Sequence, residues 1–180
     1  MIRSSRRTGD WRGVWAVALA LLVAACSPVD AAREVPTAPS ATQAADASKS
    51  AVHPISGLQI AEVTVVSGGK RFPFKTELAL SREAQTRGLM FREALADDEA
   101  MLFPNDSPQM RSFWMKNTPI SLDIIFIGPD RRITNIATAV PYSLDSVPSE
   151  SEVIAVFEIR GGLAQELGIK PGDSVEWELP

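Results

Sequence analysis

The sequence is poor in the side chains that most often carry catalysis and metal binding. Its 180 residues include one cysteine, one histidine and one tyrosine. A single cysteine forms no internal disulfide, and Ser-His, Cys-His and most zinc sites need a histidine or cysteine in the folded part of the chain. Cys26 and His53 both lie in the first third of the sequence. We therefore expect no metal site and no cofactor.

The N-terminus has the pattern of an export signal. Four arginines precede an apolar run over residues 14–25, and small residues lead into Cys26. The run has about 12 residues, whereas a bilayer-spanning helix needs about 20. The tetrapeptide Val23-Ala24-Ala25-Cys26 resembles a bacterial lipobox, whose cysteine is lipidated and becomes the first residue of the mature chain. An ordinary cleaved signal followed by an unrelated cysteine is the alternative.

This pattern predicts where the protein is found. Residues 1–25 would be a lipoprotein signal peptide, and the acylated Cys26 would attach the chain to the lipid bilayer in the cell envelope. Ser27, and not aspartate, follows the cysteine. In a Gram-negative host this favours the periplasmic face of the outer membrane.

Positive charge is scarce once the signal is removed. Residues 1–25 carry four arginines and one aspartate, so their loss changes the net charge of the chain from −4 to −7. Nucleic acids are bound through basic surfaces. We therefore expect no nucleic-acid partner.

Residues 26–57 are rich in alanine, serine, threonine and proline and contain few large apolar side chains. Such a composition buries too little surface to offset the entropy lost on folding. It predicts a disordered tether that includes His53, for which a metal or catalytic role is then not expected. The folded domain would span residues 58–180.

The domain is expected to be mainly β (α+β), with many short strands and one or two short helices. Turn signals separate segments rich in β-branched and aromatic residues, which favours a single small antiparallel β-barrel or sandwich. Ser81 and Gly88 bound one predicted helix, and a second covers 162–167. The predicted strands include 60–66, 71–79, 100–103, 132–140, 152–159 and 174–179.

The densest apolar segment of the domain contains polar residues. Residues 111–117 and 122–127 both suit strands, and four residues between them suit a hairpin loop. Lys116 would then face Asp123 across the hairpin. Either the two form an ion pair that fixes the register, or they form the polar floor of a pocket with Asn117.

Several motifs resemble one known family. They are Arg87-Gly88-Leu89-Met90-Phe91-Arg92, Met101-Leu102-Phe103, the run from Phe113 to Thr118, Leu122 to Phe126, and Val156 to Ile159 with Gly161 or Gly162. The chain is similar to the bacterial and archaeal family called domain of unknown function 192. The resemblance implies a small β-rich domain, commonly exported, with no established reaction. Glu99-Ala100-Met101 departs from the glycine that usually precedes the methionine.

We favour a binding or accessory module over an enzyme. A tethered, acidic, β-rich domain suits a small polar ligand or a cell-envelope component, such as a sugar or a peptidoglycan fragment. Arg92, Arg111 and the irregular loop 141–151 are further candidates for a role. The candidate ligand-binding residues are Arg87, Trp114, Lys116, Asn117, Asp123, Tyr142 and Glu158.

Two other functions stay open. One is a hydrolase or lyase that works without cysteine or histidine and uses Lys116 and Asp123. The other is Cu(I) binding by thioethers beside Trp114, since soft ligands suit this ion. The thioethers would be those of Met90, Met101, Met110 and Met115, which are also ordinary core residues.

Overall fold

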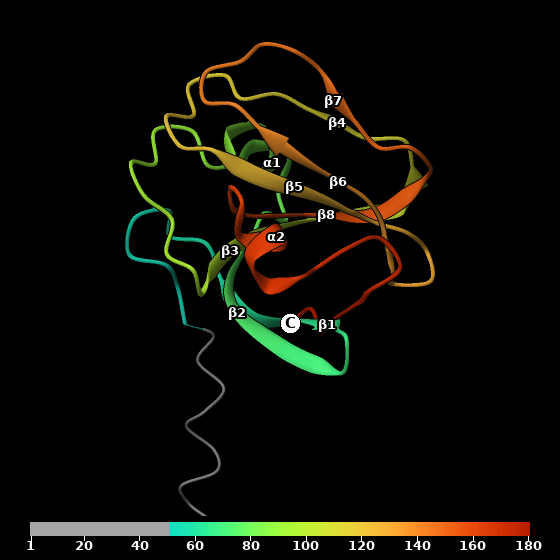
Figure 1. Ribbon diagram of the computed structural model, residues 1–180. Coiled ribbons are helices and arrows are strands. Elements are labelled where there is room, and N and C mark those ends of the chain that lie inside the picture. Colours follow the sequence, from blue (N-terminus) through green and yellow to red (C-terminus); the bar gives the residue numbers. More distant parts are fainter. Residues whose placement is uncertain (1–50) are drawn as a thin grey trace, which may run out of the picture. The chain divides into compact units, whose positions relative to one another are not determined.

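The computed structural model describes residues 51–180, so the predicted signal peptide and Cys26 lie outside the described residues (Figure 1). None of the helices within this part is long and apolar enough to cross a membrane. Its strands are β1 (Ile60–Ser67), β2 (Lys70–Leu78), β3 (Glu99–Gln109), β4 (Ser112–Phe113), β5 (Leu122–Ile127), β6 (Ile133–Ala139), β7 (Val147–Pro148), β8 (Val153–Arg160) and β9 (Ser174–Trp177). Its helices are α1 (Arg82–Arg87) and α2 (Leu163–Leu167).

Seven of the strands form one sheet in the order β6-β5-β8-β3-β2-β1-β9. All neighbours are antiparallel except β2 and β3, which are parallel. The short strands β4 and β7 form a second, two-stranded sheet. The edges of the large sheet meet only in an isolated bridge between Arg132 and Ser174, so the sheet is not a closed barrel. The predicted mainly β, sandwich-like fold with two short helices is confirmed, and the barrel alternative does not form.

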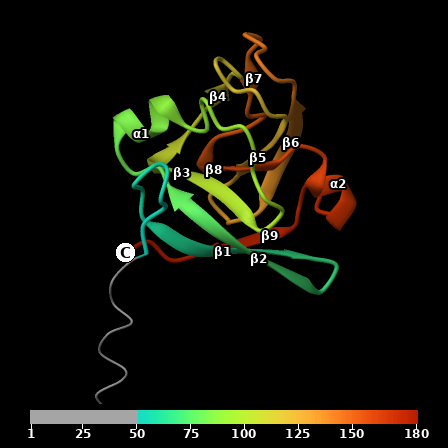
Figure 2. The ribbon, with the colours of Figure 1, turned by 90° about the vertical axis from the view of Figure 1, so that its left-hand side faces the viewer.

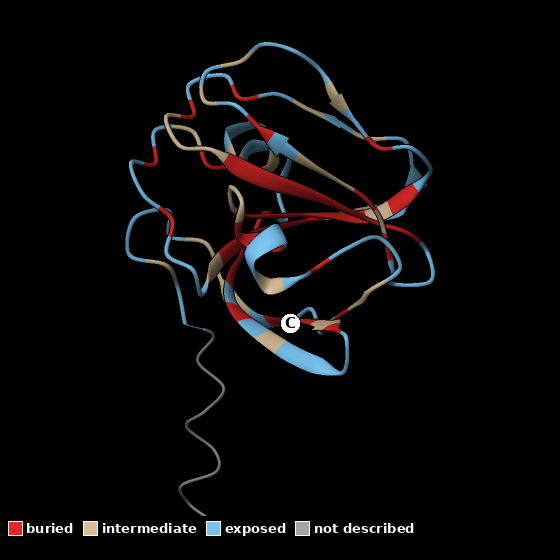
Figure 3. Ribbon diagram, in the orientation of Figure 1, coloured by how far each residue is buried: buried red, intermediate tan, exposed pale blue. Residues whose placement is uncertain are grey.

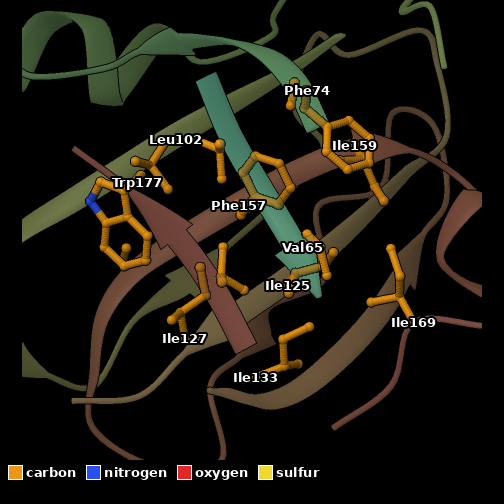
Figure 4. Close-up of a cluster of buried hydrophobic side chains, with 14 of the residues drawn as sticks. Val65, Phe74, Leu102, Ile125, Ile127, Ile133, Phe157, Ile159, Ile169 and Trp177 are labelled. Atoms are coloured by element: carbon orange, nitrogen blue, oxygen red, sulfur yellow. The ribbon is translucent and has the colours of Figure 1, made fainter. Parts of the chain in front are cut away.

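The central strands β5 and β8 are covered on both faces. All six residues of β5 are buried (Figure 3). Ile125 and Phe157 enter a core shared with β1, β2, β9 and α2 (Figure 4). Ile124 and Val156, one position along, enter a second core with Phe103 and Met115. The alternation follows from the pleat, which points successive side chains to opposite faces.

Each helix begins and ends at residues that the sequence marks. The Ser81 hydroxyl accepts a hydrogen bond from the Ala84 N–H at 3.1 Å, and Gly88 ends α1 with a φ of 49°. Gly162 and Gly168, both left-handed, flank α2. Both predicted helices are confirmed, and they lie on opposite sides of the large sheet (Figure 2).

The predicted hairpin over residues 111–127 is wrong. β5 pairs with β6 and β8, whereas β4 pairs with β7. Residues 114–121 form turns and irregular backbone between β4 and β5. Local sequence resembles a hairpin loop here, but the partners of β5 lie later in the chain. Lys116 therefore does not face Asp123.

Asp123 instead holds α2 against the sheet. Its buried carboxylate accepts hydrogen bonds from the Gly162 N–H at 2.9 Å, the Ala164 N–H at 2.8 Å and the Thr138 hydroxyl at 2.7 Å. Two of these donors are N–H groups at a helix start, which have no partner within the helix. Lys116 is exposed, with its Nζ 5.2 Å from the centre of a Trp114 ring. The predicted register-fixing ion pair does not form.

Residues 51–57, which we assigned to the tether, contact the domain. The His53 Nδ1 lies 3.2 Å from a guanidinium nitrogen of Arg92 and 3.6 Å from a carboxylate oxygen of Glu77. Arg92 and Glu77 form a buried ion pair with an N–O distance of 2.5 Å. The ordered chain therefore begins before residue 58, and His53 is held in place by two buried charged groups.

We expect Asp123→Ala to lower the free energy of unfolding by about 2–4 kcal/mol, because three hydrogen-bond donors lose their acceptor. Lys116→Met is expected to change it by less than about 0.5 kcal/mol, as is the matched surface control Lys70→Met. Urea denaturation of the single and double variants measures these values. The effects of Lys116→Met and Asp123→Ala should add, since the side chains do not interact. Recovery of stability in the double variant would contradict this assignment.

Candidate functional site

A pocket of about 150 Å³ lies between α1, the segment around β4, and β8. It exists because β2 and β3 are parallel. Parallel strands need a crossover connection, and this one carries α1 over the sheet. The polar side chains that line the pocket include Gln85, Arg87, Arg111, Thr118 and Glu158. Its apolar lining includes Leu89, Met90, Phe103, Phe113, Trp114, Met115 and Leu122.

Glu158 lies in the middle of the sheet, beside the pocket. It sits on β8 between Met101 of β3 and Ile124 of β5. Phe157 and Ile159, its neighbours in sequence, enter the first core, so Glu158 faces the second. A lone acid in an otherwise apolar buried strand is the signal that the sequence offered for this residue.

The Glu158 carboxyl has no hydrogen-bond donor among the described residues, although the residue is only 5% exposed. In the same part of the chain, every side-chain oxygen or nitrogen that is inaccessible to solvent has a hydrogen-bond partner. The carboxyl oxygens are therefore reached from the pocket. Burial raises the pKa of Glu158 to about 8, so the carboxyl is mostly protonated at neutral pH.

Arg111 provides a positive charge at the same pocket. Its guanidinium donates hydrogen bonds to the side-chain oxygens of Gln85 and Asn105, which are neutral. Gln85 also donates to the Pro104 carbonyl at 2.8 Å, and Asn105 to the Val153 carbonyl at 2.8 Å. Arg111 forms no ion pair within residues 51–180, and burial lowers its pKa from the usual value. The amides therefore orient this cation without neutralising it.

Three residues with strained backbone are linked through the segment around Thr118, which lines the pocket. Phe91, Asn117 and Tyr142 have φ values of 63°, 56° and 60°. Phe91 donates its N–H to the Asn117 carbonyl at 2.8 Å, and Tyr142 donates to the Thr118 carbonyl at 3.1 Å. Left-handed backbone is unfavourable for residues with a side chain, and such strain concentrates at functional sites. Phe91, Trp114 and Tyr142, which we call the aromatic rim, are all exposed.

A shallow groove adjoins the pocket. Arg87, Met90 and Trp114 line both, and the groove also includes Lys116 and Asn117. Asn117 contacts the Met90 sulfur at 4.0 Å. The structure thus brings Arg87, Trp114, Lys116, Asn117 and Glu158 to one side of the domain.

Two of the candidates predicted from sequence lie elsewhere. Asp123 caps α2 and does not line this pocket. Tyr142 is exposed in the loop between β6 and β7 and does not line the pocket either. Sequence reasoning missed Gln85, Asn105 and Thr118, since no local pattern distinguishes them from other polar surface residues.

The described residues do not provide the thioether cluster that the Cu(I) interpretation requires. Within residues 51–180 no three histidine, cysteine or acidic side chains gather to hold an ion. Of the four methionines, Met90 and Met115 line the pocket, Met101 is buried in the second core, and Met110 is exposed. The thioethers do not form one cluster.

The comparisons with known proteins identify relatives without a known activity. The sequence matches DUF192, an uncharacterized ACR family, over residues 63–177. A protein of unknown function from Novosphingobium aromaticivorans is 55% identical, with a TM-score of 0.69, and the match covers 71% of this chain and 91% of that one. A candidate transcription regulator from Sinorhizobium meliloti is 34% identical, with a TM-score of 0.65, and the match covers 67% and 95%. No curated protein matches the sequence.

Glu158→Gln should make unfolding less dependent on pH. The unfolded carboxyl ionises near its ordinary pKa of 4.5, whereas the folded one keeps its proton up to about pH 8. The contribution of Glu158 to wild-type stability is therefore full below pH 4.5 and is lost progressively up to pH 8, at about 1.4 kcal/mol per pH unit. Urea denaturation across this range should show that the free energy of unfolding of the variant exceeds that of wild type by several kcal/mol at pH 8. The two values should be equal at low pH. Exposed Glu152→Gln is the control, and parallel pH profiles for wild type and Glu158→Gln would refute a buried protonated carboxyl.

Proposed function

This chain belongs to the DUF192 family, and we propose that it is a membrane-tethered, extracytoplasmic domain that binds a small polar ligand in the pocket beside Glu158. The ligand would be a free small molecule or the end group of a cell-envelope component. The aromatic rim and the groove along Lys116 and Asn117 would contact any larger part of it.

The observation that carries this proposal is the carboxyl of Glu158. It is buried and unpaired among the described residues, and it is reached from a cavity. Burying a polar group without a partner costs roughly 1–3 kcal/mol. Unpaired buried polar groups are rare in native structures, and a shifted pKa in a cleft is a mark of functional sites. A ligand in the pocket would provide the missing hydrogen bonds.

The alternative functions have less support. A hydrolase or lyase using Lys116 and Asp123 needs these side chains together, but Asp123 already accepts three hydrogen bonds beside α2. Cu(I) binding needs clustered thioethers, and Met110 lies apart from the pocket. The description of the S. meliloti relative as a transcription regulator applies to that protein. The net charge of −4 of this chain does not favour DNA.

Ligand binding can be tested with a set of small polar compounds that includes neutral sugars, amino acids, carboxylates and peptidoglycan fragments. We expect at least one compound to raise the thermal unfolding temperature of the wild-type protein, because ligands that bind only the folded state stabilise it. Glu158→Leu should unfold at a higher temperature than wild type at pH 8 but should not respond to that compound. Lys170→Leu, an exposed change outside the pocket lining, is the control and should respond normally. Equal responses of wild type and Glu158→Leu, or no response to any compound, would refute binding at this pocket.

Attachment to the membrane rests on the sequence pattern before Cys26 and has its own test. Metabolic labelling with a fatty acid should mark the wild-type protein in a bacterial host, and Cys26→Ala should abolish both the label and the recovery of the protein in the membrane fraction. A Ser27→Ala variant should keep the label. Label that persists in Cys26→Ala would contradict lipidation at this residue.

A further inference from the structure

We infer that the ligand of this pocket is a small monocarboxylate, held between the Arg111 guanidinium and the carboxyl of Glu158. This inference rests on the proposed function and adds the chemical class of the ligand. One oxygen of the ligand carboxylate would accept a hydrogen bond from the Arg111 guanidinium. The other oxygen would accept a hydrogen bond from the Glu158 hydroxyl.

The charges that line the pocket favour an anion. Arg111 contacts neutral amide oxygens, and no carboxylate pairs with it among residues 51–180. Arg87 at the pocket mouth also forms no ion pair within that range, and it lines the groove as well. Glu158 is the only acidic side chain in the lining. With Glu158 neutral, the described pocket is cationic on a chain that is acidic overall.

The two polar groups also fix the kind of anion. A guanidinium has five N–H donors, so Arg111 keeps donors for a carboxylate oxygen beside those that it gives to Gln85 and Asn105. A protonated carboxyl donates one strong O–H hydrogen bond, and such bonds to a charged oxygen are short and about twice as strong as neutral ones. A carboxylate can use both donors at once. The orientation of Arg111 by Gln85 and Asn105 prepares the site before the ligand arrives.

The volume limits the size of the ligand. A cavity of about 150 Å³ is of the order that holds a benzene-sized molecule. Acetate, lactate and similar acids are within this limit. The apolar lining by Phe103, Phe113 and Met115 suits a short alkyl group behind the carboxylate.

A zwitterionic amino acid is the strongest competitor. Its carboxylate would bind Arg111 in the same way, but its ammonium group would need Glu158 ionised. The two ligands differ in the sign of their pH dependence. Binding of a monocarboxylate requires the Glu158 proton and weakens above pH 8, whereas binding of an amino acid strengthens as the proton leaves.

The other charged side chains that line the described pocket are arginines. α1 contributes Arg87 and the segment before β4 contributes Arg111, and a guanidinium keeps its charge in proteins. The flanking strands β3 and β5 contribute apolar side chains, Phe103 and Leu122, to the pocket lining. A change in affinity between pH 6 and pH 9 would therefore report on Glu158.

Isothermal titration of the full mature chain in detergent provides the test. The probes are lactate, its neutral analogue lactamide, glycine and inorganic phosphate, each at pH 6 and pH 9. We expect lactate to bind at pH 6 and the other three to bind at least tenfold more weakly. The affinity for lactate should fall about tenfold per pH unit above pH 8.

The variants separate the two polar groups. Arg111→Gln should weaken lactate binding at least tenfold, and Arg111→Lys, which keeps the charge and is less disruptive to folding, should weaken it less. Arg132→Gln makes the same change of charge at an exposed site outside the pocket and should leave binding unchanged. Glu158→Gln retains an N–H donor, so it should bind lactate with little dependence on pH.

The outcomes distinguish this inference from the proposed function. Three results would overturn the monocarboxylate while leaving a ligand site at Glu158. They are lactamide binding as tight as that of lactate, glycine binding that is stronger at pH 9 than at pH 6, and a preference for phosphate. Unchanged lactate affinity in both Arg111 variants would overturn the role of Arg111. The proposed function itself fails only if the wider compound set also gives no response that depends on Glu158.

Discussion

The placement of β8 between β3 and β5 is the constraint on which the rest of this domain depends. Both faces of the β5–β8 pair are buried, so layers must cover the sheet on each side. On one side α2, β1, β2 and β9 form the first core. On the other, α1 and the segment around β4 form the second core and enclose the pocket. Glu158 is polar at a position where this arrangement otherwise demands an apolar side chain.

Two buried carboxylates of the same domain show how environment decides their role. Asp123 receives three hydrogen bonds and serves to hold a helix. Glu158, on the neighbouring strand β8, receives none from the described residues and keeps its proton to about pH 8. Hydrogen bonds within the domain satisfy the Asp123 carboxylate, whereas no described residue donates a hydrogen bond to the Glu158 carboxyl. Sequence alone treats them as equivalent acids in apolar strands.

Local signals predicted the elements whose partners are close in the chain. The β1–β2 hairpin follows from its two glycines, and α1 follows from Ser81 and Gly88. The prediction failed for residues 111–127 because pairing with β6 and β8 is decided by the packing of both faces of the sheet, which a local pattern does not contain. The same limit applies to the site. The sequence marks Arg87, Trp114 and Glu158 as polar or aromatic residues within motifs or apolar segments. The orientation of Arg111 by Gln85 and Asn105 depends on three segments that are separate in the sequence. The composition around His53 predicts a tether, whereas the contacts of its side chain are with Glu77 and Arg92.

The late position of β8 in the sequence has a consequence for folding. β3 and β5 are synthesised before β8, but they do not pair with each other. The strand that joins them is missing until residues 153–160 are present. β1 likewise pairs with β9, which is synthesised last. The Ser67 hydroxyl at the end of β1 donates a hydrogen bond to the Gly168 carbonyl at 3.0 Å, which is also synthesised late. Such long-range contacts slow folding, because large loops must close before the contacts can form. A domain of this topology therefore completes its sheet only after nearly all of its residues have been synthesised.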